Sequence, residues 1–244
     1  MEKDDSTIRT YKYLDVIIVV FVLVLVLSNI ASSAKIIDWG VSLWSIQLSF
    51  DAGSILFPIS YIIGDVMTEV YGYKRARRVI WIGFGALVFS AVTFWFVQVL
   101  PGEATWQASV GQDTYNQILG SMSNGAIIIA SIAGYTAGPF ANAIMMAVMK
   151  VMTKGKLLWS RTIGSTIIGQ AFDTFGFIFV AVLLNVFPWS LFWSLTITNY
   201  LFKVVMETAV TPLTYLMVNG LKNSEGIDIF DTDTNFNPFK FKRS

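Results

Sequence analysis

The chain has 244 residues, of which 55% are apolar and 14% are charged, and its mean hydropathy is +0.62. Soluble domains carry about 25% charged residues, so this composition predicts a protein that is embedded in lipid over most of its length. A net charge of +1 offers no basic field for nucleic acid, and the chain has neither Cys nor His. We therefore expect no nucleic-acid partner, no metal and no cofactor.

Six apolar segments predict an all-α membrane protein with six transmembrane helices, because about 20 apolar residues cross a hydrocarbon core about 30 Å thick. The segments are residues 13–34, 55–70, 79–100, 120–149, 163–187 and 191–218. We expect a tilt or a break near Gly138 and Pro139 in the fourth segment, and an interruption at Pro212 in the sixth. No cleavable signal peptide fits the start of the chain.

The basic side chains indicate the orientation, because cytoplasmic loops are enriched in Lys and Arg. With six crossings, 15 of the 17 Lys and Arg residues lie on one side, in the segments 1–12, 74–78, 150–161 and 222–244. Both termini are therefore expected in the cytoplasm. Residues 1–220 form one transmembrane domain in this interpretation, and residues 221–244 form a polar cytoplasmic tail that we expect to be mobile.

Two local patterns add detail to this topology. Ile46, Leu48 and Phe50 alternate with polar residues, which predicts a short outer hairpin between the first and second helices. Gly134 and Gly138 are four residues apart, and we interpret this spacing as a site of close helix packing.

Five ionisable residues lie inside the predicted helices: Asp65, Glu69, Asp173, Lys203 and Glu207. An ionised side chain near the bilayer centre costs about 2.5–3.5 kcal/mol, so such residues are candidates for function. The formal charge of the set is −3, whereas a purely structural set would pair to zero. The acids lie at compatible depths, so we expect them to converge on one cavity.

Ten residues are candidates for substrate binding, because residues three or four apart share a helix face and Asn29, on the first helix, lies at a compatible depth. The candidates are Asn29, Phe57, Tyr61, Asp65, Glu69, Gln170, Asp173, Asn199, Lys203 and Glu207. Carboxylates, amides and aromatic rings together suit a flat ligand that forms hydrogen bonds. Asn29 has the alternative of holding helices together.

Two of these assignments have structural alternatives. Lys203 and Glu207 are four residues apart, so they can form an ion pair within the membrane. Glu69 can lie at the inner interface and pair with Lys74 or Arg75.

Residues 57–78, FPISYIIGDVMTEVYGYKRARR, resemble the signature of the queuosine precursor transporters, also called the vitamin uptake transporter group. Asn29 with Lys35, Gln170 with Asp173, and the stretch 199–215 fit the same family in the same order. The resemblance covers residues 28–215.

The resemblance implies a multi-pass protein of the bacterial inner membrane that imports 7-deazaguanine precursors for the salvage of queuosine in tRNA. The ligands it implies are 7-cyano-7-deazaguanine, 7-aminomethyl-7-deazaguanine and, in some members, queuine. It also implies a distant similarity to the substrate-binding subunits of energy-coupling-factor importers. A carboxylate from Asp65, Glu69, Asp173 or Glu207 can accept both N–H groups of a guanine-like edge, and Phe57 or Tyr61 can stack on the ring.

Several mechanisms stay open at this point. A solitary carrier can couple transport to protons or act as a facilitator, whereas a binding subunit would need ATPase partners. A homodimer is compatible with either mechanism. An intramembrane aspartyl protease built on Asp65 and Asp173 is disfavoured, because the sequence around Asp173 lacks a Gly-x-Gly-Asp context. We therefore expect a transporter and not an enzyme.

Overall fold

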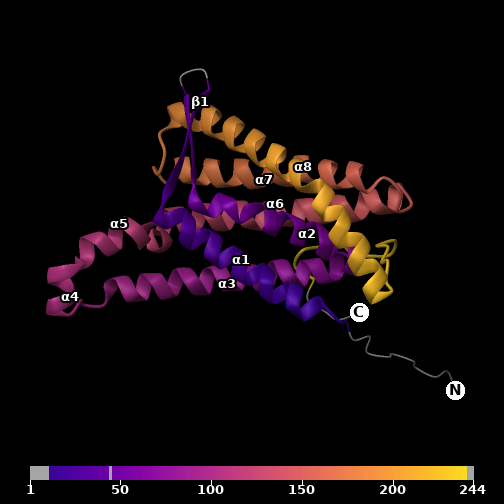
Figure 1. Cartoon of the computed structure of the whole chain (residues 1–244), viewed down its shortest axis with the longest axis horizontal. Coiled ribbons are helices and arrows are strands. Elements are labelled where there is room, and N and C mark those ends of the chain that lie inside the picture. Colours follow the sequence, from indigo (N-terminus) through magenta and orange to yellow (C-terminus); the bar gives the residue numbers. More distant parts are fainter. Residues whose placement is uncertain (1–10, 44–45, 241–244) are drawn as a thin grey trace.

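The computed structural model describes residues 11–43 and 46–240, and it consists of long helices with one small hairpin (Figure 1). The helices are α1 (Leu14–Ala34), α2 (Phe57–Tyr71), α3 (Tyr73–Val99), α4 (Ala104–Ser109), α5 (Gly111–Ser123), α6 (Gly125–Met152), α7 (Leu158–Leu183) and α8 (Phe192–Glu225). The other elements are β1 (Ile36–Leu43), β2 (Ile46–Asp51) and the short 3-10 helices η1 (Ala52–Ile55) and η2 (Trp189–Leu191).

Within the described ranges, five segments are long and apolar enough to cross a membrane. They are Leu14–Ala34, Tyr73–Val99, Gly111–Met152, Leu158–Leu183 and Trp189–Glu225. The predicted segment 55–70 forms α2, which has only 15 residues. It begins with Pro58 in its first turn and ends at Gly72, whose φ of 80° is unfavourable for residues other than glycine. Nine residues of α2 are buried, so this helix lies among its neighbours.

The predicted hairpin is confirmed. β1 and β2 pair antiparallel, with Ile37 opposite Phe50, and residues 44–45 lie outside the described part of the chain. The hairpin projects from the end of the bundle where α1 ends and α2 begins (Figure 1). This end is called the hairpin end below, and the opposite one, where α1 begins and α8 ends, is called the terminal end.

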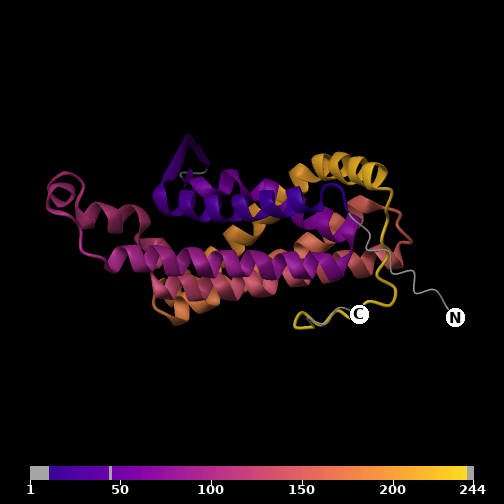
Figure 2. The same cartoon turned by 90° about the horizontal axis from the view of Figure 1, so that it is seen from below.

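The expected interruption at Pro212 is not present, and the fourth segment, for which we expected a tilt or a break, has no break at Pro139. α6 continues through Pro139 and α8 continues through Pro212. A proline removes one backbone hydrogen bond, and in a tightly packed bundle the neighbouring helices hold both halves together, so the helix bends instead of ending. α8 changes direction along its length in both views (Figures 1 and 2).

The predicted fourth segment, 120–149, is divided between two helices. α5 ends at Ser123, and α6 begins at Gly125. Between them, the side-chain oxygen of Asn124 accepts hydrogen bonds from the backbone N–H groups of Ala126 and Ile127, at 3.0 and 3.2 Å. This N-cap starts α6 at a fixed residue.

Close packing of α6 on α7 is confirmed at the two glycines singled out by their spacing. A Cβ atom on Gly138 would lie 2.5 Å from the Cβ of Asp173, and one on Gly134 would lie 2.8 Å from the backbone oxygen of Asp173. Only hydrogen fits in these gaps, so the glycines allow α7 to bring Asp173 against α6.

The C-terminal segment 226–240 is docked on the terminal end, which differs from the mobile tail expected from its polar composition. The backbone N–H of Tyr73 donates to Asp231 at 2.9 Å. Arg77 donates to backbone oxygens of residues 235 and 237, and Trp81 donates to that of residue 238. Ile227 and Asp231 are buried. Polar groups of α3 thus supply hydrogen bonds that sequence composition does not reveal.

Candidate functional site

A cavity of about 660 Å³ lies inside the bundle, with residues of α1, α2, α3, α5, α6, α7 and α8 in its lining. Ser33, Met122 and Phe187 line it near the hairpin end. Eight of the ten predicted site residues line this cavity: Asn29, Phe57, Tyr61, Gln170, Asp173, Asn199, Lys203 and Glu207. The prediction that polar groups from separate helices meet in one hollow therefore agrees with the geometry for these eight.

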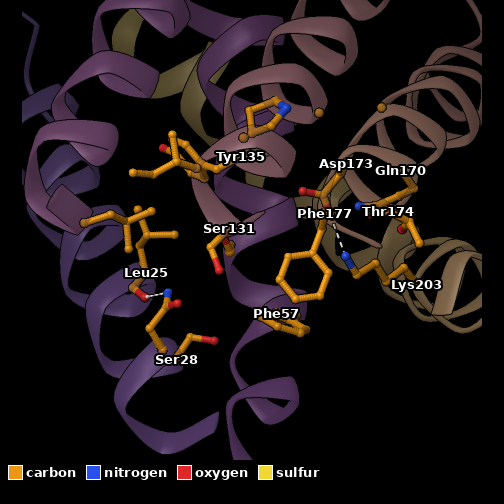
Figure 3. A pocket seen from close by; sticks show the side chains of 18 of the residues that line it. Leu25, Ser28, Phe57, Ser131, Tyr135, Gln170, Asp173, Thr174, Phe177 and Lys203 are labelled. Carbon is orange, nitrogen blue, oxygen red and sulfur yellow. Dashed lines mark hydrogen bonds and ion pairs between the residues drawn. The ribbon is translucent and has the colours of Figure 1, made fainter. Parts of the chain in front are cut away.

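An ion pair joins α7 and α8 in the cavity. Lys203 Nζ lies 2.5 Å from Asp173 Oδ2, and both side chains are partly exposed (Figure 3). Lys203 forms its salt bridge with Asp173, and not with Glu207 as helical spacing allowed. Phe57 and Phe177 line the same cavity (Figure 3).

Glu207 is held by an amide. Its carboxylate is 3% exposed, and Gln170 Nε2 donates to its Oε2 at 3.0 Å. The amide oxygen of Gln170, Oε1, has no hydrogen-bond partner and is buried.

Asp65 does not line the cavity. It is 1% exposed, and it accepts a hydrogen bond at 3.2 Å from Asn142 Nδ2. Asn142 does line the cavity, so the connection of Asp65 to the cavity runs through this amide. We expected Asp65 and Asp173 to line the same cavity, but only Asp173 does.

Two of the polar lining residues that sequence reasoning missed have a feature in common. Asn142, on α6, and Thr174, one turn beyond Gln170 on α7, both carry a buried oxygen without a partner. An amide in the middle of an apolar helix is a recognisable signal, because the bilayer provides no water to satisfy it. A threonine is too common in membrane helices to give such a signal.

Glu69 lies away from the cavity, in a buried charge cluster at the terminal end. This Glu69 cluster consists of Glu69, Lys150, Arg161, Lys222 and Asp228. Arg161 binds both carboxylate oxygens of Glu69 at 2.7 Å, and Lys222 Nζ lies 2.5 Å from Oε1. Glu69 is fully buried, and Arg161 is 1% exposed.

The cluster joins four helices to the C-terminal segment. Lys150 Nζ donates to the backbone oxygen of Glu69 at 2.6 Å and to Asp228 at 2.5 Å, and Lys222 also contacts Asp228. The pairing of Glu69 with Lys74 or Arg75, which are near in sequence, is therefore wrong. Removing one member of such a buried set leaves an uncompensated charge, so the cluster fixes α2 against α6, α7 and α8.

Comparisons with known proteins identify the family of the chain. No solved structure matches the chain. A protein of Bacillus subtilis (strain 168) named "Probable queuosine precursor transporter" is 28% identical over 180 residues, which cover 73% of this chain and 76% of that protein. The family described as "Putative vitamin uptake transporter" matches residues 51–217, more than half of the chain. The chain therefore belongs to this family of vitamin uptake transporters, and it is a multi-pass membrane transporter rather than an enzyme.

Proposed function

We propose that this protein imports 7-deazaguanine precursors of queuosine across the bacterial inner membrane. The observation that carries the proposal is the 660 Å³ cavity, in which amides, a carboxylate and aromatic rings from separate helices surround a common space. Binding sites for small molecules commonly have volumes of about 300–1,000 Å³. The name of the Bacillus subtilis relative points to the same class of ligand.

The lining suits a flat heterocycle. The rings of Phe57 and Tyr61 lie 6.1 Å apart on consecutive turns of α2, and Phe177 of α7 faces the same cavity. Aromatic faces stack on a planar base, while amide groups both donate and accept hydrogen bonds at its edge. The Asp173–Lys203 pair adds one acceptor and one donor.

The proposal includes six crossings with both termini in the cytoplasm. η1 and α2 together run from Ala52 to Tyr71, and 20 helical residues extend about 30 Å, which is the thickness of the hydrocarbon core. The backbone N–H groups of Lys12 and Tyr13 donate to Glu225, so α1 begins where α8 ends. The basic residues of the Glu69 cluster lie at this same end, which favours the cytoplasmic side for it.

Transport then proceeds by alternating access around the cavity. The cavity reaches the hairpin end, which is the outer side in this topology, and the buried Glu69 cluster lies at the inner end. Release into the cytoplasm therefore requires separation of helices that the cluster joins. Uptake by purified protein in proteoliposomes, with and without a pH gradient, distinguishes proton coupling from facilitated transport. The alternative of a binding subunit with ATPase partners has no support in the comparisons, and a homodimer stays a prediction.

The first test is direct binding to the detergent-purified protein. We expect 7-cyano-7-deazaguanine, 7-aminomethyl-7-deazaguanine or queuine to bind more tightly than guanine. Equal affinity for guanine and the 7-substituted bases would contradict the proposed substrate class.

The second test is uptake by two cavity variants. Asp173→Asn and Glu207→Gln should abolish uptake while the protein still inserts into the membrane. Asp113→Asn is the matched control, because Asp113 lies on α5 outside the cavity and is exposed. Normal uptake by both cavity variants would rule out this cavity as the transport site.

A further inference from the structure

The cavity contains two hydrogen-bond arrangements of the same kind. In each, a buried carboxylate accepts a hydrogen bond from the NH₂ group of an amide that lines the cavity: Asp65 from Asn142, and Glu207 from Gln170. In each, the oxygen of that amide is buried and has no partner. The two arrangements come from different pairs of helices, α2 with α6 and α8 with α7.

We propose that the amide oxygens of Asn142 and Gln170, assisted by the hydroxyl of Thr174, accept the N–H groups of an aminopyrimidinone ring, and that Asp65 and Glu207 orient these amides. The inference deepens the proposed function and rests on it. It assigns recognition of the base edge to neutral amides, whereas the sequence suggested direct contact with a carboxylate. Asp65 and Glu207 are positioning residues in this scheme.

The orientation follows from hydrogen-bonding chemistry. An amide has a donor side and an acceptor side, and a carboxylate oxygen is an acceptor. The NH₂ group of Asn142 donates to Asp65 in the structure, which leaves the amide oxygen as the group without a protein partner. The same reasoning applies to Gln170, which is only 8% exposed. Because a carboxylate binds the NH₂ group of each amide, the amide oxygens select a ligand that donates hydrogen bonds.

The distribution of unpartnered atoms supports a ligand at this place. Folded proteins leave few buried polar atoms without hydrogen bonds. Among the described residues, four buried side-chain atoms lack a partner, and three of them belong to cavity residues: Asn142, Gln170 and Thr174. The fourth belongs to Thr162, which does not line the cavity. A bound ligand would satisfy the three.

The chemistry of the three atoms defines the ligand class. Two acceptors and one hydroxyl suit a ligand with at least two donor hydrogens, and the aromatic rings of the lining favour a flat one. A 2-amino-pyrimidin-4-one ring has a ring N–H beside an exocyclic amino group, and a fused pyrrole adds a third N–H. A hypoxanthine-type ring lacks the exocyclic amino group, so one buried acceptor would stay unpartnered when it binds.

The experiment compares two ligands on the purified full chain: 7-cyano-7-deazaguanine and its analogue without the 2-amino group. The wild-type protein should prefer the amino compound about tenfold, as expected for one lost hydrogen bond in a buried site. The variants are Asn142→Leu and Gln170→Met, and one of them removes the oxygen that accepts the 2-amino group. In that variant the ratio of the two affinities should fall to about one. Unchanged preference in both variants would overturn the inference.

Thr174→Val and Thr162→Val form a matched pair, because both remove a buried, unpartnered hydroxyl from α7 and only Thr174 lines the cavity. We expect Thr174→Val to weaken binding of the amino compound about tenfold, and Thr162→Val to leave the affinity unchanged. Equal effects of the two substitutions would overturn the role of Thr174.

The positioning role of Asp65 is tested with Asp65→Asn, which keeps the shape of the side chain. The new NH₂ group can donate to Asn142 Oδ1, so the amide can turn and present its donor side to the ligand. The preference for the amino compound should fall while the melting temperature of the protein stays within a few degrees of wild type. A variant that keeps the wild-type preference would contradict the role of Asp65.

The outcomes separate the two proposals. A wild-type protein that binds no 7-deazaguanine would overturn the proposed function and this inference with it. If the wild-type protein binds these bases and all of the variants keep the wild-type preference, only the inference is overturned.

Discussion

Gly138 is a position at which the smallest substitution should damage the site. A Cβ atom at this residue would lie 2.5 Å from the Cβ of Asp173 and 3.1 Å from its Cα. Carbon atoms make favourable contacts from about 3.5 Å, so the Gly138→Ala side chain would need about 1 Å more space. The obstructing atoms belong to the first part of a side chain and to the backbone, so α6 and α7 must move apart as whole helices.

The cost can be isolated with a matched control. Gly85 lies on α3 with no atom within 4 Å of the position of its Cβ. Gly85→Ala should therefore show only the gain in helix propensity, about 1 kcal/mol. Gly138→Ala receives the same gain and in addition suffers overpacking of about 1–3 kcal/mol. The difference in the free energy of unfolding between the two variants is therefore about 1–3 kcal/mol in favour of Gly85→Ala.

The assay is thermal unfolding of the two detergent-purified variants. For a chain of this size, 1 kcal/mol corresponds to about 2–4 °C, so Gly138→Ala should melt roughly 2–12 °C below Gly85→Ala. Ligand binding should weaken in Gly138→Ala alone, because Asp173 and its ion pair with Lys203 move with α7. If the two variants had the same melting temperature and both bound ligand with the wild-type affinity, the packing argument would be refuted.

Three further predictions concern the ends of the bundle. Glu69→Gln should destabilise the protein by about 3–5 kcal/mol in thermal unfolding, since Arg161 stays buried without its counter-charge, and adding Arg161→Met should recover part of that loss. Burial raises the pKa of Asp228, but hydrogen bonds from Lys150 and Lys222 outweigh it, so the net pKa is lowered. Docking of residues 226–240 should hold above the unfolded pKa of about 3.9 and weaken as pH falls through the folded value. The measurement is the hydrogen-exchange protection of these residues relative to an unfolded chain at the same pH, and Asp228→Asn should remove the dependence of this protection on pH. Asn124→Ala should cost about 1 kcal/mol of stability by removing the cap of α6, whereas Asn124→Asp should retain it.

The helices were predictable because hydropathy acts locally. A run of apolar residues long enough to cross the bilayer is visible in the sequence, and α1, α7 and α8 begin within five residues of their predicted starts. The boundary between α5 and α6 was missed, since the cap at Asn124 depends on one side chain within an otherwise suitable segment. The continuity of α8 through Pro212 depends on neighbouring helices, which spacing along the chain does not describe.

The cavity was predictable in part for the same reason. Residues three or four apart on one helix indicate which face turns inward, and Gln170, Lys203 and Glu207 do line the cavity. Asp65 and Glu69, selected by the same spacing, do not. Partners across helices were not predictable: the partner of Glu69 is Arg161, 92 residues away, rather than the nearby Lys74. A single sequence contains no signal for such a pairing, because Arg161 is equally suited to mark a cytoplasmic loop.

The separation between Glu69 and Arg161 also has a consequence for biosynthesis. A ribosome adds about 5–20 residues per second, so the separation of 92 residues delays the guanidinium by roughly 5–18 s after the carboxylate. Throughout that interval Glu69 lacks the guanidinium that binds both of its carboxylate oxygens in the folded protein. α2 should therefore reach its final position only when α7 has been synthesised. The order in which the helices pack then differs from the order in which they are synthesised.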